Sequence, residues 1–296
     1  MIGRRWFSPW LWILPALLFL GVFLVYPVID TIRVSLTDTS SSAAVSVDNY
    51  RDLFTESDFR QTLLNNVLWL VLFTGATVAL GLVIAVLTNQ VRYEAAAKAL
   101  IFIPMAVSFV AAGVIWTFMY QFQPDAPGFT QTGTVNAVWT GLGGSPVAWL
   151  VDNGKIPVYG INNLAIVAAG IWMWTGFAMV ILSAGLKGIP KEILEAARVD
   201  GAREGQVFRR IIIPMLWPTI TVVGVTLMIT SLKTFDLVFV MTGGRFDTDL
   251  VATRMWREMF IALNFGRASA VAVILILAIV PIMLLNIRRF RQQEQG

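Results

Sequence analysis

The chain has 296 residues, of which 57% are hydrophobic and 14% are charged, and its mean hydropathy is +0.72. This composition excludes an ordinary water-soluble domain, because the apolar residues lie in long blocks that predict membrane-spanning segments. The chain contains no cysteine and no histidine. Disulfides, thiolate or histidine metal sites and a Ser-His-Asp triad are therefore excluded, and we expect neither catalytic residues nor a metal site.

Six charge-free windows are long enough to cross a bilayer, which requires about 20 mainly apolar residues. We therefore predict an all-α, polytopic membrane protein with six transmembrane helices and both termini on one side. The N-terminus could also be a cleavable secretory signal, but its length, its two prolines and its lack of a small-x-small site favour a retained first helix. The windows are 6–29, 62–91, 99–123, 156–186, 211–232 and 268–287.

The distribution of Lys and Arg predicts the orientation of these helices. With both termini in the cytoplasm, the inner segments carry 13 of the 22 basic residues but 6 of the 18 acidic ones. We therefore expect a cytoplasmic loop at 188–210 and an extracytoplasmic loop at 124–157. This asymmetry explains the net charge of +4 without a nucleic-acid partner. The lipid membrane is the partner that the composition requires.

Three local features stand out before the fifth window. Residues 47–64 place apolar side chains at roughly helical spacing among charges, which predicts a helix on the outer membrane surface. Pro104 lies inside the third window and predicts a kink there. The connection 123–157 is rich in Gly, Pro, Asn and Thr, so we expect a loop that is either functional or disordered.

The fifth window is followed by a charged interruption, Lys233 and Asp236. A charge at the bilayer centre costs roughly 2.5–3.5 kcal/mol, so we expect these residues either near the outer end of the helix or in a polar cavity. Their spacing of three allows an ion pair within one helix. Snorkelling at a helix end and direct ligand contact are alternative explanations.

The stretch 195–214, EAARVDGAREGQVFRRIIIP, is a charged segment between two apolar windows. Pro190 suits the first turn of a helix and Gly201 suits a left-handed C-terminal cap. The sequence therefore predicts a short helix over 189–200, followed by a second helix that runs from Arg203 into the membrane.

The residues of this segment follow the pattern Glu-Ala-Ala, three residues, Gly, nine residues and Ile-x-aliphatic-Pro. The pattern resembles the cytoplasmic coupling loop of permease subunits in binding-protein-dependent ABC importers, with Ile213 where that family more often has Leu. The resemblance covers nearly the whole chain and favours the maltose-type carbohydrate permeases, above all the six-helix α-glucoside permeases. The further segments that carry it are YPV at 26–28, VDNY at 47–50, WMWTGF at 172–177 and FDLVFVMTGG at 235–244.

This resemblance implies the type I ABC importer permease fold, built as a single transmembrane domain over 1–296. It implies a location in the cytoplasmic membrane of a bacterium or archaeon. It also implies three kinds of partner: a second permease subunit in a heterodimer, two ABC ATPase subunits and an extracytoplasmic sugar-binding protein. The chain has no Gly-x4-Gly-Lys-Ser/Thr motif. We therefore expect no cofactor and no enzyme activity in this chain, with ATP and Mg bound by the ATPase.

The resemblance also implies roles for individual residues. In the coupling loop, Glu195 would reach a basic residue of the ATPase, while the small side chains beside it would permit close approach. A sugar would bind between the fourth and fifth helices, with Gly176 leaving room for the ring. The implied coupling residues are Glu195, Ala196, Ala197, Asp200 and Gly201. The implied path residues are Trp172, Gly176, Met179, Thr230, Ser231 and Thr234.

Two questions about the path stay open. Met179 and Thr234 depart from the maltose pattern, so either this subunit or its partner could hold the sugar. Trp172 and Trp174 cannot share a helix face, so we expect at least one to pack in the protein or to contact lipid.

Other functions fit the sequence less well. Secondary transporters usually carry broken helices or intramembrane carboxylates, and the six windows contain no Asp or Glu. A membrane-embedded enzyme would lack a catalytic set. The function that the family resemblance implies is therefore the one we keep: the translocating subunit of an ATP-driven importer for an α-glucoside or disaccharide. A polyol, a glycerol phosphate or an oligosaccharide is the alternative substrate within the same class.

Overall fold

The computed structural model describes residues 8–37, 45–89, 91–124, 126, 128, 130, 132–151, 155–156 and 159–293. The described chain is nearly all helical, which confirms the all-α prediction. Two short strands, β1 (Lys155–Ile156) and β2 (Tyr159–Gly160), pair antiparallel. The predicted start of the first window, Trp6, lies outside the described residues.

The helices are, in chain order, α1 (Ser8–Leu20), α2 (Tyr26–Ser35), α3 (Asp48–Thr55), α4 (Ser57–Leu68), α5 (Thr74–Thr88), α6 (Glu94–Phe102), α7 (Phe109–Met119), α8 (Thr134–Gly141), α9 (Ile161–Lys187), α10 (Lys191–Val199), α11 (Glu204–Val207), α12 (Ile213–Leu232), α13 (Asp236–Met241), α14 (Val251–Phe260) and α15 (Phe265–Gln293). Continuous π-helical turns join α1 to α2, α4 to α5 and α11 to α12; they are Gly21–Val25, Trp69–Phe73 and Phe208–Ile212.

In the described part of the chain, five helical stretches are long and apolar enough to cross a membrane. A bent pair, α6 and α7, which meet at an angle of 97°, makes the sixth of the predicted crossings when it is counted as one span. The bend follows a 3-10 turn that contains Pro104, which confirms the predicted kink. The five continuous stretches are Trp12–Ser35, Ser57–Thr88, Ile161–Lys187, Glu204–Leu232 and Phe265–Leu284.

The predicted surface helix over 47–64 is two separate elements, so that prediction was wrong in its extent. Helix α3 ends before Glu56, whose backbone is extended with ψ at 130°. At this break, the Glu56 carboxylate forms ion pairs with Arg254 and Arg267. Helix α4 then begins at Ser57 and runs directly into the second membrane-crossing stretch.

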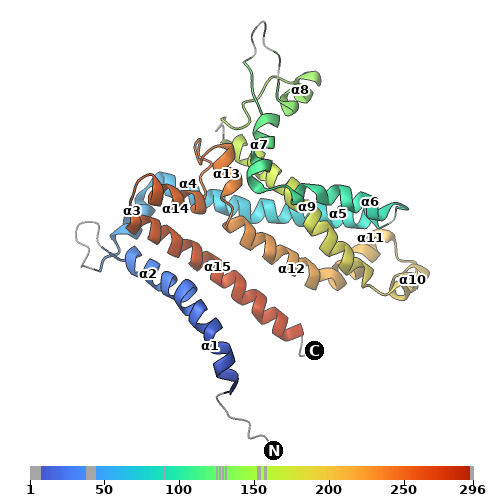
Figure 1. Ribbon diagram of the computed structural model, residues 1–296. Helices are drawn as coiled ribbons and strands as arrows, with labels where there is room; N and C mark the ends of the chain where they lie inside the picture. Colours follow the sequence, from blue (N-terminus) through green and yellow to red (C-terminus); the bar gives the residue numbers. More distant parts are fainter. Residues whose placement is uncertain are drawn as a thin grey trace, which may run out of the picture. The chain divides into compact units, whose positions relative to one another are not determined.

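The described chain divides into two compact units. The first contains the chain up to Phe59 and Arg254–Leu277, and the second contains Arg60–Thr253 and the rest of α15. Within the second unit, α5 and α9 lie side by side and α12 contacts both (Figure 1). A Cβ placed on Gly81 of α5 would lie 2.6 Å from the Cβ of Ala178, so glycine permits this close crossing.

Four asparagines fix the loop between α13 and α14 in the second unit. Two residues of this loop, Phe246 and Asp247, adopt left-handed backbone with φ of 58° and 59°, which residues with a bulky side chain rarely adopt. The amides of α4 and α9 hold this backbone in place, and we call them the asparagine clamp. The Asn65 amide donates to the carbonyls of Asp247 (2.7 Å) and Asp249 (2.9 Å), and the Asn66 amide oxygen accepts the N–H of Val251 (2.8 Å). The Asn162 amide donates to the carbonyl of Phe246 (2.6 Å), and the Asn163 amide donates to the carbonyl of Asp247 (3.0 Å).

Candidate functional site

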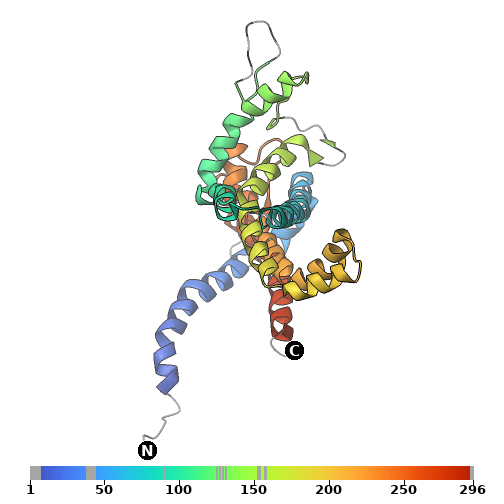
Figure 2. The ribbon, with the colours of Figure 1, turned by 90° about the vertical axis from the view of Figure 1, so that its right-hand side faces the viewer.

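A helical hairpin formed by α10 and α11 connects the ends of α9 and α12 and extends sideways from them (Figure 2). Helix α10 begins at Lys191, two residues later than predicted, because Pro190 has an extended backbone with ψ at 129°. Leu194 packs against the core of the second unit, and Val207 of α11 is buried. The hairpin is therefore attached to the membrane-crossing helices by its own apolar side chains.

The turn of the hairpin is closed by Gly201, whose φ of 83° confirms the predicted left-handed cap. The N–H of Ala202 donates to the carbonyl of Ala197 at 3.0 Å, and the N–H of Gly201 donates to the carbonyl of Arg198 at 3.0 Å. These two bonds form a Schellman motif, which satisfies the last carbonyls of α10. The direction in which α11 leaves α10 is thus set by a backbone conformation that favours glycine.

An ion pair across the turn also joins the two helices. Arg198 Nε donates to Glu204 Oε1 at 2.7 Å, and Arg198 Nη2 donates to Glu204 Oε2 at 3.2 Å. This paired geometry raises the pKa of Arg198. The pair was missed in the sequence, although an Arg and a Glu on either side of a glycine turn were visible signals.

The predicted coupling residues lie together on this hairpin. Glu195, Ala196 and Asp200 are exposed, and Ala197 is half-buried. The carboxylate of Glu195 takes no part in the paired contact between Arg198 and Glu204. It is therefore available to a basic residue of another protein.

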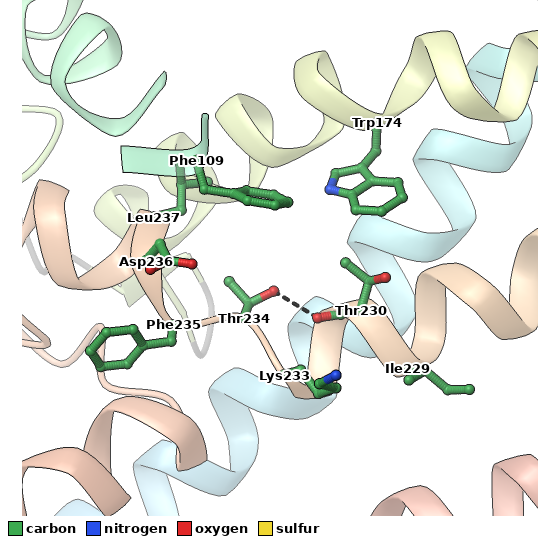
Figure 3. Close-up of a pocket in the computed structure, with 9 residues that line it drawn as sticks. All are labelled: Phe109, Trp174, Ile229, Thr230, Lys233, Thr234, Phe235, Asp236 and Leu237. Carbon is green, nitrogen blue, oxygen red and sulfur yellow. Dashed lines mark hydrogen bonds between the residues drawn. The ribbon is translucent and has the colours of Figure 1, made fainter. Parts of the chain in front are cut away.

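A cavity of about 350 Å³ lies where α7, α9, α12 and α13 meet (Figure 3). Phe109 and Trp174 form an aromatic wall, with ring centroids 6.1 Å apart. Thr230 and Thr234 lie across from this wall, and the Thr234 hydroxyl donates to the Thr230 carbonyl at 3.0 Å. The other lining residues are Ile229, Lys233, Phe235, Asp236 and Leu237.

The two charged residues of the cavity stand at a break between helices. Helix α12 ends at Leu232, and α13 begins at Asp236. The predicted ion pair within one helix is therefore absent, because Lys233 and Asp236 belong to different elements. Both side chains are exposed, and neither forms an ion pair with a residue that the structure describes. The two residues therefore line the cavity just after the membrane-crossing stretch Glu204–Leu232 ends.

Two of the six predicted path residues, Thr230 and Thr234, line this cavity. Ser231 is buried, and its hydroxyl donates to the carbonyl of Met228 at 2.8 Å. Met179 is fully buried in the core between α9 and its neighbours. The structure therefore brings together the threonines but not the buried Ser231 and Met179.

Gly176 and Trp172 also lie away from the cavity. A Cβ on Gly176 would lie 2.6 Å from the carbonyl oxygen of Ile101, so this glycine permits contact between α9 and α6. Trp172 is 38% exposed and packs edge-on against Trp116, with ring centroids 5.7 Å apart. Trp174, two residues further along α9, is the tryptophan that faces the cavity.

Phe109, Phe235 and Leu237 were missed in the sequence as cavity residues. The signal for Phe109 was its position just after the predicted kink, where Ser108 Oγ caps α7 by accepting the N–H of Ala111 at 3.2 Å. Phe235 and Leu237 could have been found from their positions beside Lys233 and Asp236, the charged residues that interrupt the apolar pattern after the fifth window. Within the described ranges, no group of three or more acidic side chains is placed to hold a metal ion.

The chain is similar in sequence to known transport proteins. Residues 77–290 match the protein family described as "Binding-protein-dependent transport system inner membrane component". The chain is 51% identical over 285 residues to the osmoprotective compounds uptake permease protein GgtC of Synechocystis sp., covering 96% of this chain and 99% of the relative. It is 43% identical over 289 residues to the alpha-glucoside transport system permease protein AglF of Rhizobium meliloti, covering 97% and 84%.

A solved structure shares the fold. It is a chain from a bacterial ABC transporter involved in the import of the acidic polysaccharide alginate, with a TM-score of 0.75 and 22% identity. The match covers 95% of this chain and 94% of that chain.

Replacing Gly201 by Ala tests the cap. A left-handed conformation costs a residue with a Cβ roughly 1–2 kcal/mol, so the amides at the end of α10 should exchange hydrogen about tenfold faster. The control is Gly205→Ala, because Gly205 has no positive φ and a Cβ there meets no atom within 4 Å. Hydrogen–deuterium exchange measured by mass spectrometry compares the two variants. Equal protection in both would contradict the structural role of Gly201.

Proposed function

Because the chain belongs to the family of binding-protein-dependent transport system inner membrane components, we propose that it forms the translocation path of a carbohydrate ABC importer. Members of this family are multi-pass membrane subunits of transport systems. The observation that carries the proposal is the arrangement of α9 and α12. The same two helices line the cavity and hold the hairpin, so one rigid connection links a ligand site to an exposed coupling element.

The lining of the cavity supports a neutral polyhydroxyl substrate. The faces of Phe109 and Trp174 suit the C–H surface of a sugar ring, while the threonine hydroxyls can bond to its edges. Among the residues that the structure describes, the lining contains one cation, Lys233, one anion, Asp236, and no Arg. A phosphorylated substrate would favour a paired guanidinium contact. A small α-glucoside or disaccharide fits best, as the name of the AglF relative also suggests.

A second candidate substrate comes from the more similar of the two relatives. GgtC is named as an uptake permease for osmoprotective compounds and is 51% identical to this chain, compared with 43% for AglF. The unpaired charges of Lys233 and Asp236 could also bind a small zwitterion. An osmoprotective solute is therefore the alternative within the same mechanism.

An uptake assay with the complete transporter decides between these substrates. The labelled panel is maltose, trehalose, sucrose, glycine betaine and glycerol 3-phosphate. We expect uptake of at least one disaccharide and none of glycerol 3-phosphate. Preference for glycine betaine would support the second candidate. Preference for the phosphate would contradict both.

Replacing Trp174 by Ala should lower the rate of sugar uptake by about tenfold. Loss of an aromatic face removes roughly 0.5–1.5 kcal/mol of stacking beyond the loss of buried area. Trp172→Ala is the matched control, because Trp172 packs on Trp116 outside the cavity. Initial uptake rates at equal expression provide the measurement. A larger loss for Trp172→Ala would place the path on the other face of α9.

We propose that the hairpin docks on a separate ABC ATPase, which binds ATP and Mg. The exposed carboxylate of Glu195 and the small Ala196 and Ala197 provide the contact, while Asp200 and Gly201 shape the turn. The complete transporter would contain this chain, a second permease subunit in a heterodimer, two ATPases and an extracytoplasmic sugar-binding protein. Support for these partners comes from the family description and from the exposed hairpin.

Reversing the charge of Glu195 with Lys should reduce substrate-stimulated ATP hydrolysis by roughly tenfold, because a charge-assisted hydrogen bond contributes about 1.5–3 kcal/mol. Glu192→Lys makes the same charge change one turn earlier on α10 and is the control. The assay is ATP hydrolysis by the reconstituted complex with and without loaded binding protein. Equal loss in both variants would assign the effect to net charge instead of to Glu195.

We propose that the hairpin and both termini face the cytoplasm, because basic residues concentrate at that end of the helices. Since the chain lacks cysteine, single cysteines report topology cleanly. Cysteine at Gly205 should react with an impermeant reagent from the cytoplasmic face, and cysteine at the exposed Leu142 should react from the opposite face. Labelling of both cysteines from one face would exclude this topology.

A further inference from the structure

A separate pocket of about 570 Å³ lies where the turn between α5 and α6, the start of α6 and the end of α9 meet. Three basic side chains line it, Arg92, Lys98 and Lys187, together with Glu94. We call it the basic pocket. Helix α9 ends at Lys187 and α10 begins at Lys191. The basic pocket therefore lies at the hairpin end of α9 and shares no residue with the substrate cavity.

The charges in the basic pocket do not cancel. Glu94 Oε1 contacts Lys98 Nζ and also pairs with Lys187 Nζ at 2.6 Å, so one carboxylate serves two ammonium groups. Arg92 is exposed and has no ion pair with any residue that the structure describes. Three cations and one anion leave a net charge of +2. The pocket can therefore attract a ligand that carries negative charge.

Neutral groups fix one of these cations in place. Lys98 Nζ donates to Asn89 Oδ1 at 2.6 Å and contacts Ser183 Oγ. The Ser183 hydroxyl in turn donates to Asn89 Oδ1 at 2.7 Å. The side chains of Asn89 and Ser183 thus hold the Lys98 ammonium group in place, while Arg92 and most of the Lys187 side chain remain accessible to a ligand.

Residues close to the pocket residues in the chain carry exposed apolar side chains. Tyr93 is 70% exposed, Leu100 is 69% exposed and Leu87 is 59% exposed. Two membrane-crossing stretches end here, at Thr88 and Lys187. Basic and tyrosine side chains above an apolar surface are typical of the depth of lipid headgroups. A ligand with a charged head and an apolar tail would satisfy both parts of this surface.

We propose that the basic pocket binds the phosphate of an anionic phospholipid, whose acyl chains lie along the adjoining apolar surface. Arg92 would bond two phosphate oxygens, and the lysines would act as point charges. Basic pockets between membrane helices bind anionic headgroups in this manner. Inorganic phosphate shares the charge but gains nothing from the apolar surface. A bound headgroup would hold the end of α9 from which the hairpin starts.

The test measures lipid binding to the full-length chain in its purified complex. Native mass spectrometry compares bound phosphatidylglycerol with bound phosphatidylcholine after exchange from mixed vesicles. Arg92→Gln together with Lys187→Gln should weaken phosphatidylglycerol binding by about 30-fold, the factor expected for two basic residues at an anionic surface. The control, Arg209→Gln together with Arg210→Gln, removes two exposed cations from the π-helical turn between α11 and α12 and should leave this binding unchanged.

Three results would overturn the proposal. They are equal binding of both lipids by the unmodified chain, equal loss in the two double variants, and full displacement of the lipid by millimolar inorganic phosphate. If the pocket double variant does not fold, Arg92→Gln alone replaces it, because Arg92 has no ion pair to lose. That variant should weaken binding by roughly fivefold, and unchanged binding would again overturn the proposal.

Discussion

The fold depends on one constraint, which is that a backbone inside a lipid bilayer must satisfy its own hydrogen bonds. A helix can stop within the membrane only where protein or water pairs the free N–H and C=O groups. Two interruptions, between α6 and α7 and between α12 and α13, adjoin the cavity through Phe109 and through the segment from Lys233 to Asp236. Breaks in regular structure therefore create the polar site.

The same constraint links the cavity to the hairpin. Between their ends, α9 and α12 are continuous, because an interruption facing lipid would be costly. Movement of the hairpin must therefore displace whole helices. The Schellman turn at Gly201 and the pair between Arg198 and Glu204 make α10 and α11 one stiff unit. Such rigid-body motion is a common form of switching in transporters and enzymes.

Much of this architecture could be predicted from the sequence. The length of the apolar windows predicted the five continuous membrane-crossing stretches and the bent pair, Pro104 predicted the kink in that pair, and Gly201 predicted the helix cap, because each of these features depends on the local sequence. The residues of the cavity could not be predicted in the same way. Which of Trp172 and Trp174 faces the cavity depends on how α9 is rotated against α6 and α7. From the sequence, we expected Gly176 to leave space for a ligand. In the structure, its missing side chain instead makes room for the backbone of Ile101 in α6.

The asparagine clamp has a consequence for biosynthesis. The loop between α13 and α14 takes its shape from Asn65 and Asn163, which precede Asp247 in the chain by 182 and 84 residues. Because a nascent chain leaves the ribosome N-terminus first, both amides are made long before the backbone that they hold. The left-handed turn at Phe246 and Asp247 can gain these hydrogen bonds only after α4 and α9 have been synthesised and lie beside it. Its closure during synthesis therefore depends on two helices that are complete long before the loop itself is made.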